Sequence, residues 1–235
     1  MTWSILVRDP ATGALGAAVA TRFFAVGALC LHVEGNVGAL ATQALINPMY
    51  GSHGMAQLRA GDPPDAVAAA LLEADAGRDH RQLHMIDAAG RIAQYTGAAC
   101  VTWCGSVRGQ DVSVAGNMLA GPLVVEATLA AFQRAESSLP ERLLTALEAG
   151  EAAGGDKRGK QSAALKICTH DPYPDLDIRA DDHPDPLAEL RRLHRVSLER
   201  FAVFRRFLPG TDSPCGVFDR NVIDAAVARE GRPPG

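Results

Sequence analysis

The chain has no run of about twenty apolar residues, and its start does not combine a basic stretch with a short apolar one. We therefore expect no membrane-spanning helix, no secretory leader and a protein of the cytoplasm. Aromatic residues make up only 5% of the 235 residues, and the net charge is −4. Because no basic excess is available to neutralise a phosphate backbone, the composition argues against a nucleic-acid partner.

Cysteine is sparse, and its five positions are scattered: Cys30, Cys100, Cys104, Cys168 and Cys215. An odd, dispersed set is typical of reduced thiols rather than of a disulfide framework. Only Cys100 and Cys104 lie close together, and no second Cys or His pair follows at the spacing of a tetrahedral zinc site. The sequence therefore predicts no metal and no cofactor.

The remaining composition is that of an ordinary globular protein, with 47% apolar and 21% charged residues. The length favours one domain of about 200 residues over two domains that would each need a core. We place this domain at residues 1–208, with a long final helix at its end. Residues 209–235 are rich in Gly, Pro and Ser, and we expect them to form a loosely attached tail.

Alternating apolar and small residues between turn-forming clusters predict strands. These strands are expected at residues 4–8, 14–20, 29–33, 37–42, 82–86, 91–95, 97–103, 112–117, 162–168 and 176–180. Apolar residues at helical spacing predict helices at residues 48–61, 66–74, 121–137 and 142–153 and from residue 185 onward, with a short one at 222–228. Strand groups that alternate with helix pairs predict an α+β fold of two packed sheets with helices outside.

Thr2 directly follows Met1 and precedes the first predicted strand. Removal of Met1, which a small second residue permits, would leave a hydroxyl and a free α-amine on one residue. Such an amine has a reference pKa of about 7.7 to 8.0, so part of it is unprotonated near neutral pH and able to take the hydroxyl proton. The alternative is that Thr2 is an ordinary second residue chosen for processing.

A series of short motifs runs in order along the first two hundred residues. It consists of Met1-Thr2-Trp3-Ser4-Ile5, Asp9-Pro10, Thr12-Gly13, Ala41-Thr42-Gln43-Ala44, Asn47-Pro48, Tyr50-Gly51, Asp87, Gly90-Arg91, Thr96-Gly97, Gly116-Asn117, Gly154-Gly155-Asp156, Arg158-Gly159, Gln161-Ser162-Ala163-Ala164 and Asp181-Asp182-His183-Pro184. The series resembles a bacterial family of unknown function, domain-of-unknown-function family 1028, which is assigned to the N-terminal-nucleophile (Ntn) hydrolase superfamily by its fold.

The resemblance implies a four-layer αββα sandwich of two mainly antiparallel sheets. It also implies hydrolysis of a carbon–nitrogen bond through an acyl-enzyme on the N-terminal residue, which is Thr2 here. Ser4 faces the same side of the strand as Thr2 but has no free amine, so we expect it to form a hydrogen bond in the core. The histidines lie singly in the sequence, and His53 and His80 are the first that we would examine for a role beside a hydroxyl.

Two further residues are candidates near the predicted nucleophile. Asn117, next to Gly116 at a strand end, offers an amide that would stabilise an oxyanion, although both residues are also common in turns. Arg22 ends the second strand, where a cation would lower the pKa of the α-amine or hold an acidic substrate. The alternative for Arg22 is an ion pair on the surface.

The remaining substrate-binding candidates lie in connections between elements. Gln43 and Asn47 flank a strand-to-helix passage, where they would bind a substrate amide or cap the helix that follows. The loop at residues 154–162 is the most polar of the chain and contains Asp156 and Gln161. We interpret it as a flexible lid or a loop for an anionic substrate, with an exposed connection as the alternative.

The sequence thus predicts a cofactor-free amidohydrolase that acts on a small-molecule amide through Thr2. The alternative is a non-catalytic small-molecule-binding or assembly protein on the same fold. The arginine-rich final helix contains three phenylalanines, Phe201, Phe204 and Phe207. This is more apolar surface than the edge of one small domain usually buries, and it predicts a homodimer.

Overall fold

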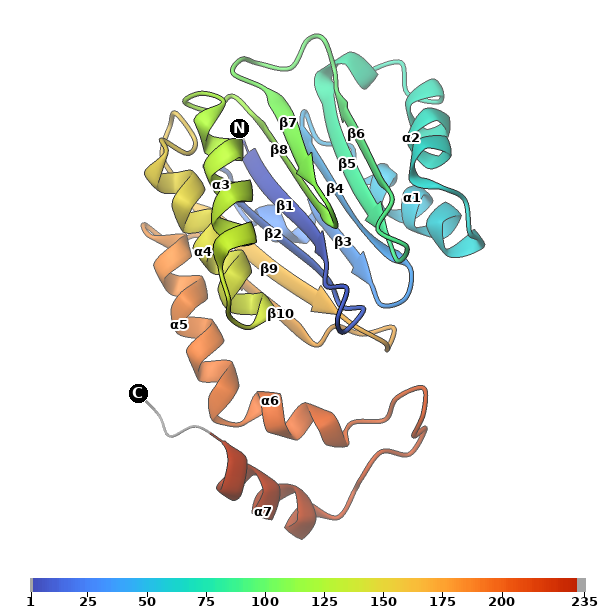
Figure 1. The fold of residues 1–235 in the computed structure, drawn as a ribbon, viewed down its shortest axis with the longest axis vertical. Helices are drawn as coiled ribbons and strands as arrows, with labels where there is room; N and C mark the ends of the chain where they lie inside the picture. Colours follow the sequence, from blue (N-terminus) through green and yellow to red (C-terminus); the bar gives the residue numbers. More distant parts are fainter. Residues whose placement is uncertain (1, 232–235) are drawn as a thin grey trace.

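Ten strands form the centre of the protein in the computed structural model, which describes residues 2–231 (Figure 1). Their bounds are β1 Thr2–Arg8, β2 Leu15–Thr21, β3 Leu31–Glu34, β4 Gly38–Ala44, β5 Arg81–Asp87, β6 Ile92–Thr96, β7 Gly105–Gly109, β8 Val112–Asn117, β9 Ser162–Cys168 and β10 Leu176–Ala180. They form a six-stranded sheet in the order β10-β9-β2-β1-β8-β7 and a four-stranded sheet in the order β3-β4-β5-β6. Every strand pair in both sheets is antiparallel.

A pair of helices covers the outer face of each sheet (Figure 1). Helices α1 (Met49–Ala60) and α2 (Pro64–Glu73) lie on the four-stranded sheet, and α3 (Leu123–Arg134) and α4 (Leu139–Ala152) lie on the six-stranded sheet. The fold is therefore the four-layer αββα sandwich, as expected. Among residues 2–231, no helix combines the length and the apolar character needed to cross a membrane.

Strand β1 is central because it pairs with β2 on one side and β8 on the other. Its alternate side chains face different layers: Trp3 and Ile5 belong to the core beneath α3 and α4, and Leu6 belongs to the core between the sheets. All three are fully buried, and burial of each such side chain stabilises the fold by about 1.5 to 3 kcal/mol. This packing on both faces fixes the position of Thr2, the residue where the strand begins.

The helices begin and end at residues that suit those positions. Gly61, with φ of 97°, ends α1 in the left-handed conformation that glycine adopts readily. Helix α5 (Pro186–Glu199) has proline in its first turn, and the Asp185 carboxylate accepts a hydrogen bond from the Ala188 amide at 3.2 Å. Asp185 thus caps a helix, the role that its position directly before Pro186 favours.

The structure corrects two of the predicted elements. Residues 97–103 form no strand, because a turn closes between the Cys100 amide and the Gly97 carbonyl and the chain continues as a loop to β7. The long final helix is interrupted at Arg200, whose φ of −137° is not helical. The chain continues as α6 (Phe201–Phe204), the 3-10 turn at Arg205–Phe207 and α7 (Arg220–Glu230).

The segment from α6 to α7 extends beyond the layered body in Figure 1, and we call residues 201–231 the C-terminal arm. An ion pair from Arg206 to Glu230 links its two halves, and one from Arg200, directly before the arm, to Asp224 holds α7. The Tyr173 hydroxyl, beside the β9–β10 hairpin, donates a hydrogen bond to the Pro209 carbonyl at 2.7 Å. The division of the chain at residue 208 remains a prediction, and residues 232–235 of the predicted tail lie outside the described residues.

Candidate active site

Thr2 is the first described residue and opens the central strand of the larger sheet. It lies opposite Asn117 of β8, and its hydroxyl donates a hydrogen bond to the Thr21 hydroxyl of β2 at 3.2 Å. The residue is only 7% exposed. Met1, whose removal would leave Thr2 with a free α-amine, lies outside the described residues.

The Thr2 side chain lines a cavity of about 160 Å³, which we call the Thr2 cavity. Its apolar lining consists of Phe23, Ala25, Val26, Leu29, Leu45 and Ile46 together with Ala44. Cys30, Thr42 and Gln43 complete the wall. The first residue of the strand therefore borders a space that a small molecule can enter.

A second cavity of about 190 Å³, which we call the Asn117 cavity, adjoins the first. Ala44 and Leu45 line both cavities and therefore form the wall between them. His80 and Asn117 contribute polar groups to the second cavity. Thus Thr2 and Asn117, which are paired in the sheet, border two neighbouring spaces at the same end of the strands.

Backbone strain is concentrated around these two cavities. Among residues 2–231, five non-glycine residues have a positive φ, and Ala25 (50°), Ala44 (71°) and Met118 (60°) each line one or both cavities. The others are Asn36 and Asp111, residue types that adopt this conformation more readily. Left-handed alanine and methionine are costly, and such residues cluster at sites of function.

The side chain of Gln82, from β5, orients two candidate residues across the space between the sheets. Its Oε1 atom accepts hydrogen bonds from Gln43 Nε2 at 2.8 Å and from Asn117 Nδ2 at 3.0 Å. Its own amide nitrogen donates to the Gly116 carbonyl at 2.9 Å. Because Gln82 is fully buried, it holds Gln43 and Asn117 at the two cavities in fixed orientations.

Ser4, two residues after Thr2 on β1, begins a buried chain of hydrogen bonds that continues through His84 to Ser113. Ser4 donates its proton to Gln43 Oε1 at 2.7 Å, so the contact of 2.8 Å between Ser4 Oγ and His84 Nε2 has the imidazole as donor. His84 Nδ1 then accepts from the Ser113 hydroxyl at 2.8 Å. Burial lowers the pKa of His84 to about 3, so the ring is neutral at neutral pH. Ser4 forms the core hydrogen bonds that its position in the strand predicts.

The sequence interpretation missed His84 and directed attention to His53 and His80, both of which are exposed. The available signal was the alternation in β5, where Gln82 and His84 are polar and the residue after each of them, Leu83 and Met85, is apolar. In a strand buried on both faces, that pattern indicates a polar layer on one face.

Asp156 lies next to Arg22 and holds its backbone. The fully buried carboxylate accepts hydrogen bonds from the Arg22 amide at 2.9 Å and the Arg158 amide at 2.8 Å, and it forms an ion pair with the Arg158 guanidinium. Arg22 Nη1 in turn donates to the Arg158 carbonyl at 2.7 Å. Asp156 thereby fixes the end of β2, where Thr21 contacts Thr2.

Arg22 and Gln161 line a third, more open cavity of about 460 Å³ together with Lys160, Asp182 and His183. Among residues 2–231, Arg22 forms no ion pair with a carboxylate, which leaves its charge available to a ligand. Gln161 donates a hydrogen bond to Asp182 at 3.1 Å. No group of three or more His, Cys, Asp or Glu side chains in the described part of the chain comes together as metal ligands would.

Asn47 lies outside the lining of all three cavities. Its Oδ1 atom accepts a hydrogen bond from the Met49 amide at 3.1 Å, at the start of α1, and its amide donates to Asp75 Oδ2 at 3.1 Å. Of the two roles that the sequence left open for Asn47, these contacts correspond to helix capping. They do not test a contact with substrate.

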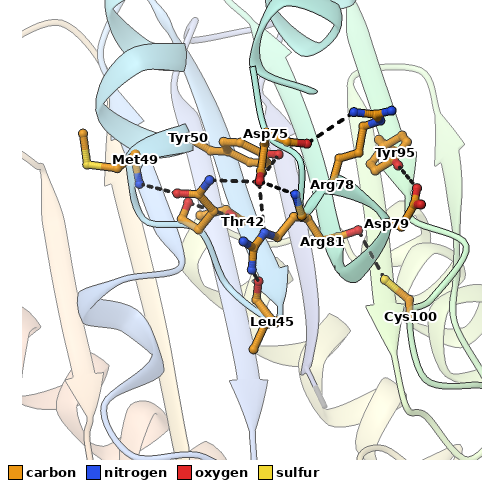
Figure 2. Close-up of polar contacts among 12 residues, drawn as sticks. Thr42, Leu45, Met49, Tyr50, Asp75, Arg78, Asp79, Arg81, Tyr95 and Cys100 are labelled. Carbon is orange, nitrogen blue, oxygen red and sulfur yellow. Dashed lines mark hydrogen bonds and ion pairs between the residues drawn. The ribbon is translucent and has the colours of Figure 1, made fainter. Parts of the chain in front are cut away.

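Asp75 is the centre of the polar cluster in Figure 2. It accepts hydrogen bonds from the Tyr50 hydroxyl at 2.8 Å and from Arg81 Nε at 3.0 Å. The Arg81 guanidinium therefore holds the pKa of the Asp75 carboxyl well below its usual range. Arg81 also donates to the Leu45 carbonyl at 2.5 Å. The cluster thus anchors the wall between the Thr2 and Asn117 cavities.

The layers and the cavities at the start of β1 define an αββα protein with a candidate site at one end of the central strand of its larger sheet. The chain belongs to the family of unknown function DUF1028, whose model matches residues 2–190.

The solved structures that are similar to the chain include the following two. Protein SPO2555 from Silicibacter pomeroyi, a DUF1028 protein, shares 33% identity with a TM-score of 0.87, over 93% of this chain and 99% of that one. Anbu (ancestral beta-subunit) from Yersinia bercovieri shares 15% identity with a TM-score of 0.37, over 88% of this chain and 98% of that one. No curated protein matches the chain.

Proposed function

We propose that the protein is an Ntn-type amidohydrolase that cleaves the carbon–nitrogen bond of a small amide through Thr2 after removal of Met1. The observation that carries this proposal is the position of Thr2 at the start of a rigid central strand and in the wall of a cavity. The strain at Ala25, Ala44 and Met118 around the same cavities supports it.

In the proposed reaction, Thr2 Oγ1 attacks the amide carbon while the α-amine of Thr2 takes the hydroxyl proton. The amine passes this proton to the leaving nitrogen as the carbon–nitrogen bond breaks, which leaves an ester on Thr2. Water then attacks the ester, and its proton returns through the amine to Thr2 Oγ1 as the acid is released. The Thr21 hydroxyl, at 3.2 Å, orients Thr2 Oγ1 between these steps.

Asn117 is the proposed oxyanion donor. One Nδ2 hydrogen is bonded to Gln82, so the amide is held in place and its second hydrogen is available for the developing charge. Arg22 and Gln43 are the proposed contacts for substrate, and Asp156 keeps Arg22 in position. Gln161 and Asn47 would contribute to substrate binding indirectly, because their hydrogen bonds hold the loops in which they lie.

The test compares Thr2→Ala with Thr2→Ser on a panel of small amides, ureas and lactams, after intact mass has confirmed that Met1 is absent. Removal of a nucleophile lowers turnover by orders of magnitude, so we expect Thr2→Ala to reduce kcat/KM by more than about 10³-fold. Thr2→Ser keeps a hydroxyl and should retain measurable activity. Thr211→Ala, at an exposed threonine of the C-terminal arm, is the matched control.

Two results would contradict the mechanism. One is equal turnover by the wild-type protein and Thr2→Ala. The other is retention of Met1 in native material, because an acylated nitrogen cannot act as the base; that result would favour the non-catalytic binding or assembly protein.

We also propose that the protein forms a homodimer through the C-terminal arm. The arm carries apolar side chains exposed to solvent, among them Phe218 at 89% and Val222 at 50%. Exposed apolar groups on a projecting segment are typical of surfaces that a second chain covers.

A further inference from the structure

From the Thr2 cavity we infer the substrate class: an amide whose acyl part is uncharged, apolar and about as large as a benzene ring, such as a benzoyl or a short branched aliphatic group. The inference rests on the proposed function, because it takes Thr2 as the atom that receives the acyl group. It adds which half of the substrate enters the Thr2 cavity and how large that half is.

Apart from the α-amine of Thr2, which the mechanism uses as the base, the lining of the Thr2 cavity provides no group that would bind a charge. None of the described residues in its wall is Asp, Glu, Lys, Arg or His. Its polar groups already have partners, since Thr42 donates to the Asn47 carbonyl at 3.2 Å and Gln43 is bonded to Ser4 and Gln82. Burial raises the pKa of the Cys30 thiol to about 12, so this group is neutral as well. A charged acyl group would lose its hydration here without compensation.

The size of the cavity limits the acyl group. Its volume of about 160 Å³ is close to that of apolar protein cavities of about 150 Å³ that bind benzene. It is smaller than the roughly 300 to 1,000 Å³ of pockets for drug-sized ligands. A long aliphatic chain therefore does not fit, and an acetyl group leaves most of the apolar wall without contact.

The mouth of the cavity has the same apolar character. Phe23, Leu29 and Leu45 line the cavity and are 58%, 44% and 64% exposed. Contact with an apolar ligand would remove part of this surface from water. The Asn117 cavity begins on the other side of Leu45 and contains polar groups from Asn117 and His80, so it suits the amine half of the substrate.

The first experiment measures kcat/KM of the processed protein on 4-nitroanilides with acetyl, isovaleryl, benzoyl, decanoyl and succinyl groups. One well-placed methylene changes kcat/KM by about 10- to 200-fold, so we expect benzoyl or isovaleryl to exceed acetyl by at least about tenfold. Decanoyl and succinyl should be the poorest substrates. A preference for either of these two would overturn the inference.

A pair of substitutions at Ile46, in the cavity wall, tests whether this space holds the acyl group. Ile46→Phe should fill the cavity and shift the preference towards acetyl, and Ile46→Ala should shift it towards groups larger than benzoyl. Ile92→Ala is the matched control, because Ile92 packs partly buried against the same inter-sheet core but does not line the cavity. Unchanged selectivity in both Ile46 variants would also overturn the inference.

Calorimetry with benzamide separates the two levels of the proposal, because binding needs no turnover. We expect benzamide to bind the wild-type protein and Ile92→Ala, and Ile46→Phe to weaken binding by at least about tenfold. Binding of this kind without hydrolysis of any amide would support the cavity assignment and overturn the proposed function. Thr2-dependent hydrolysis that prefers charged or long acyl groups would support the proposed function and overturn the cavity assignment.

Discussion

At the scale of single residues, His84 shows how burial between the two sheets keeps an imidazole uncharged. Its ring lies between the Ser4 and Ser113 hydroxyls, and burial lowers its pKa to about 3. In the unfolded chain a histidine has a pKa of about 6.5. Between these two values the unfolded state binds more protons, so the free energy of unfolding decreases as the pH falls through this range.

We expect the protein to lose about 2 kcal/mol of stability through His84 between pH 7 and pH 5. Urea titrations at the two pH values measure this loss. In His84→Gln the contribution should disappear, whatever the absolute stability of that variant. In His53→Gln, at an exposed histidine of α1, it should remain. The same pH dependence in the wild-type protein and His84→Gln would refute this interpretation.

Some residues around the site were predictable from the sequence, and others were not. Thr2 and Asn117 could be placed because Thr2 lies just before one predicted strand and Asn117 ends another, although only the register brings them opposite one another. His84 and Ser4 are 80 positions apart, and Gln82 and Asn117 are 35 apart. Contacts at such separations depend on which strands are neighbours and how the sheets face each other, which periodicity does not determine.

At the scale of elements, the cluster around Asp75 joins α1 to β5. Asp75 follows α2, Tyr50 belongs to α1 and Arg81 begins β5, so one carboxylate links three separate segments (Figure 2). The Asp75 side chain is 14% exposed and that of Arg81 is 18% exposed. A charge-assisted contact this far from water stabilises the fold more than a surface ion pair does.

Asp75→Asn should lower the free energy of unfolding by about 2 to 3 kcal/mol, because it removes the charge that Arg81, Tyr50 and Asn47 share. For a protein of this size, that corresponds to a decrease in Tm of about 4 to 12 °C. Calorimetry provides the measurement. Asp79→Asn, at an exposed carboxylate of the same loop, should change the stability by less than about 0.5 kcal/mol, and an equal loss in both variants would contradict the assignment.

The predicted elements differ in how well they agree with the structure, for physical reasons. Strands β8, β9 and β10 have the predicted bounds, because each combines a sustained apolar pattern with clear turns at both ends. Residues 97–103 have a similar composition, but their amides and carbonyls bond locally and to the segment after β8, as from Met118 to Val101. Only Gly97 and Cys100 of this segment are buried, so its apolar composition indicates neither its burial nor the backbone partners that it finds.

At the scale of the whole molecule, the layered body and the C-terminal arm differ in how they bury apolar side chains. The body has three cores, one between the sheets and one beneath each helix pair. The arm is held by ion pairs and a few hydrogen bonds, and Phe218 on it is almost fully exposed. The order of elements predicted the layers, whereas nothing in the sequence indicated the direction of the arm.

If the arm forms the proposed homodimer, Phe218→Ser should weaken it. Burial of a phenylalanine contributes about 1.5 to 3 kcal/mol, which corresponds to a roughly 10- to 100-fold increase in the dissociation constant. Sedimentation over a range of concentrations measures this change. Phe24→Ser, at a phenylalanine of the body that is 63% exposed, is the control. A wild-type protein that is monomeric at every concentration would rule out the dimer.

The partition formed by Ala44 and Leu45 has a consequence for the order of product release. Under the proposed mechanism, the amine departs through the chamber beside Asn117 while the acyl group stays in its own compartment, attached to Thr2. Hydrolytic water then enters by the route that the amine has vacated. The two products therefore occupy different compartments. Each should inhibit the enzyme by competing with one half of the substrate, and both should be able to bind at the same time.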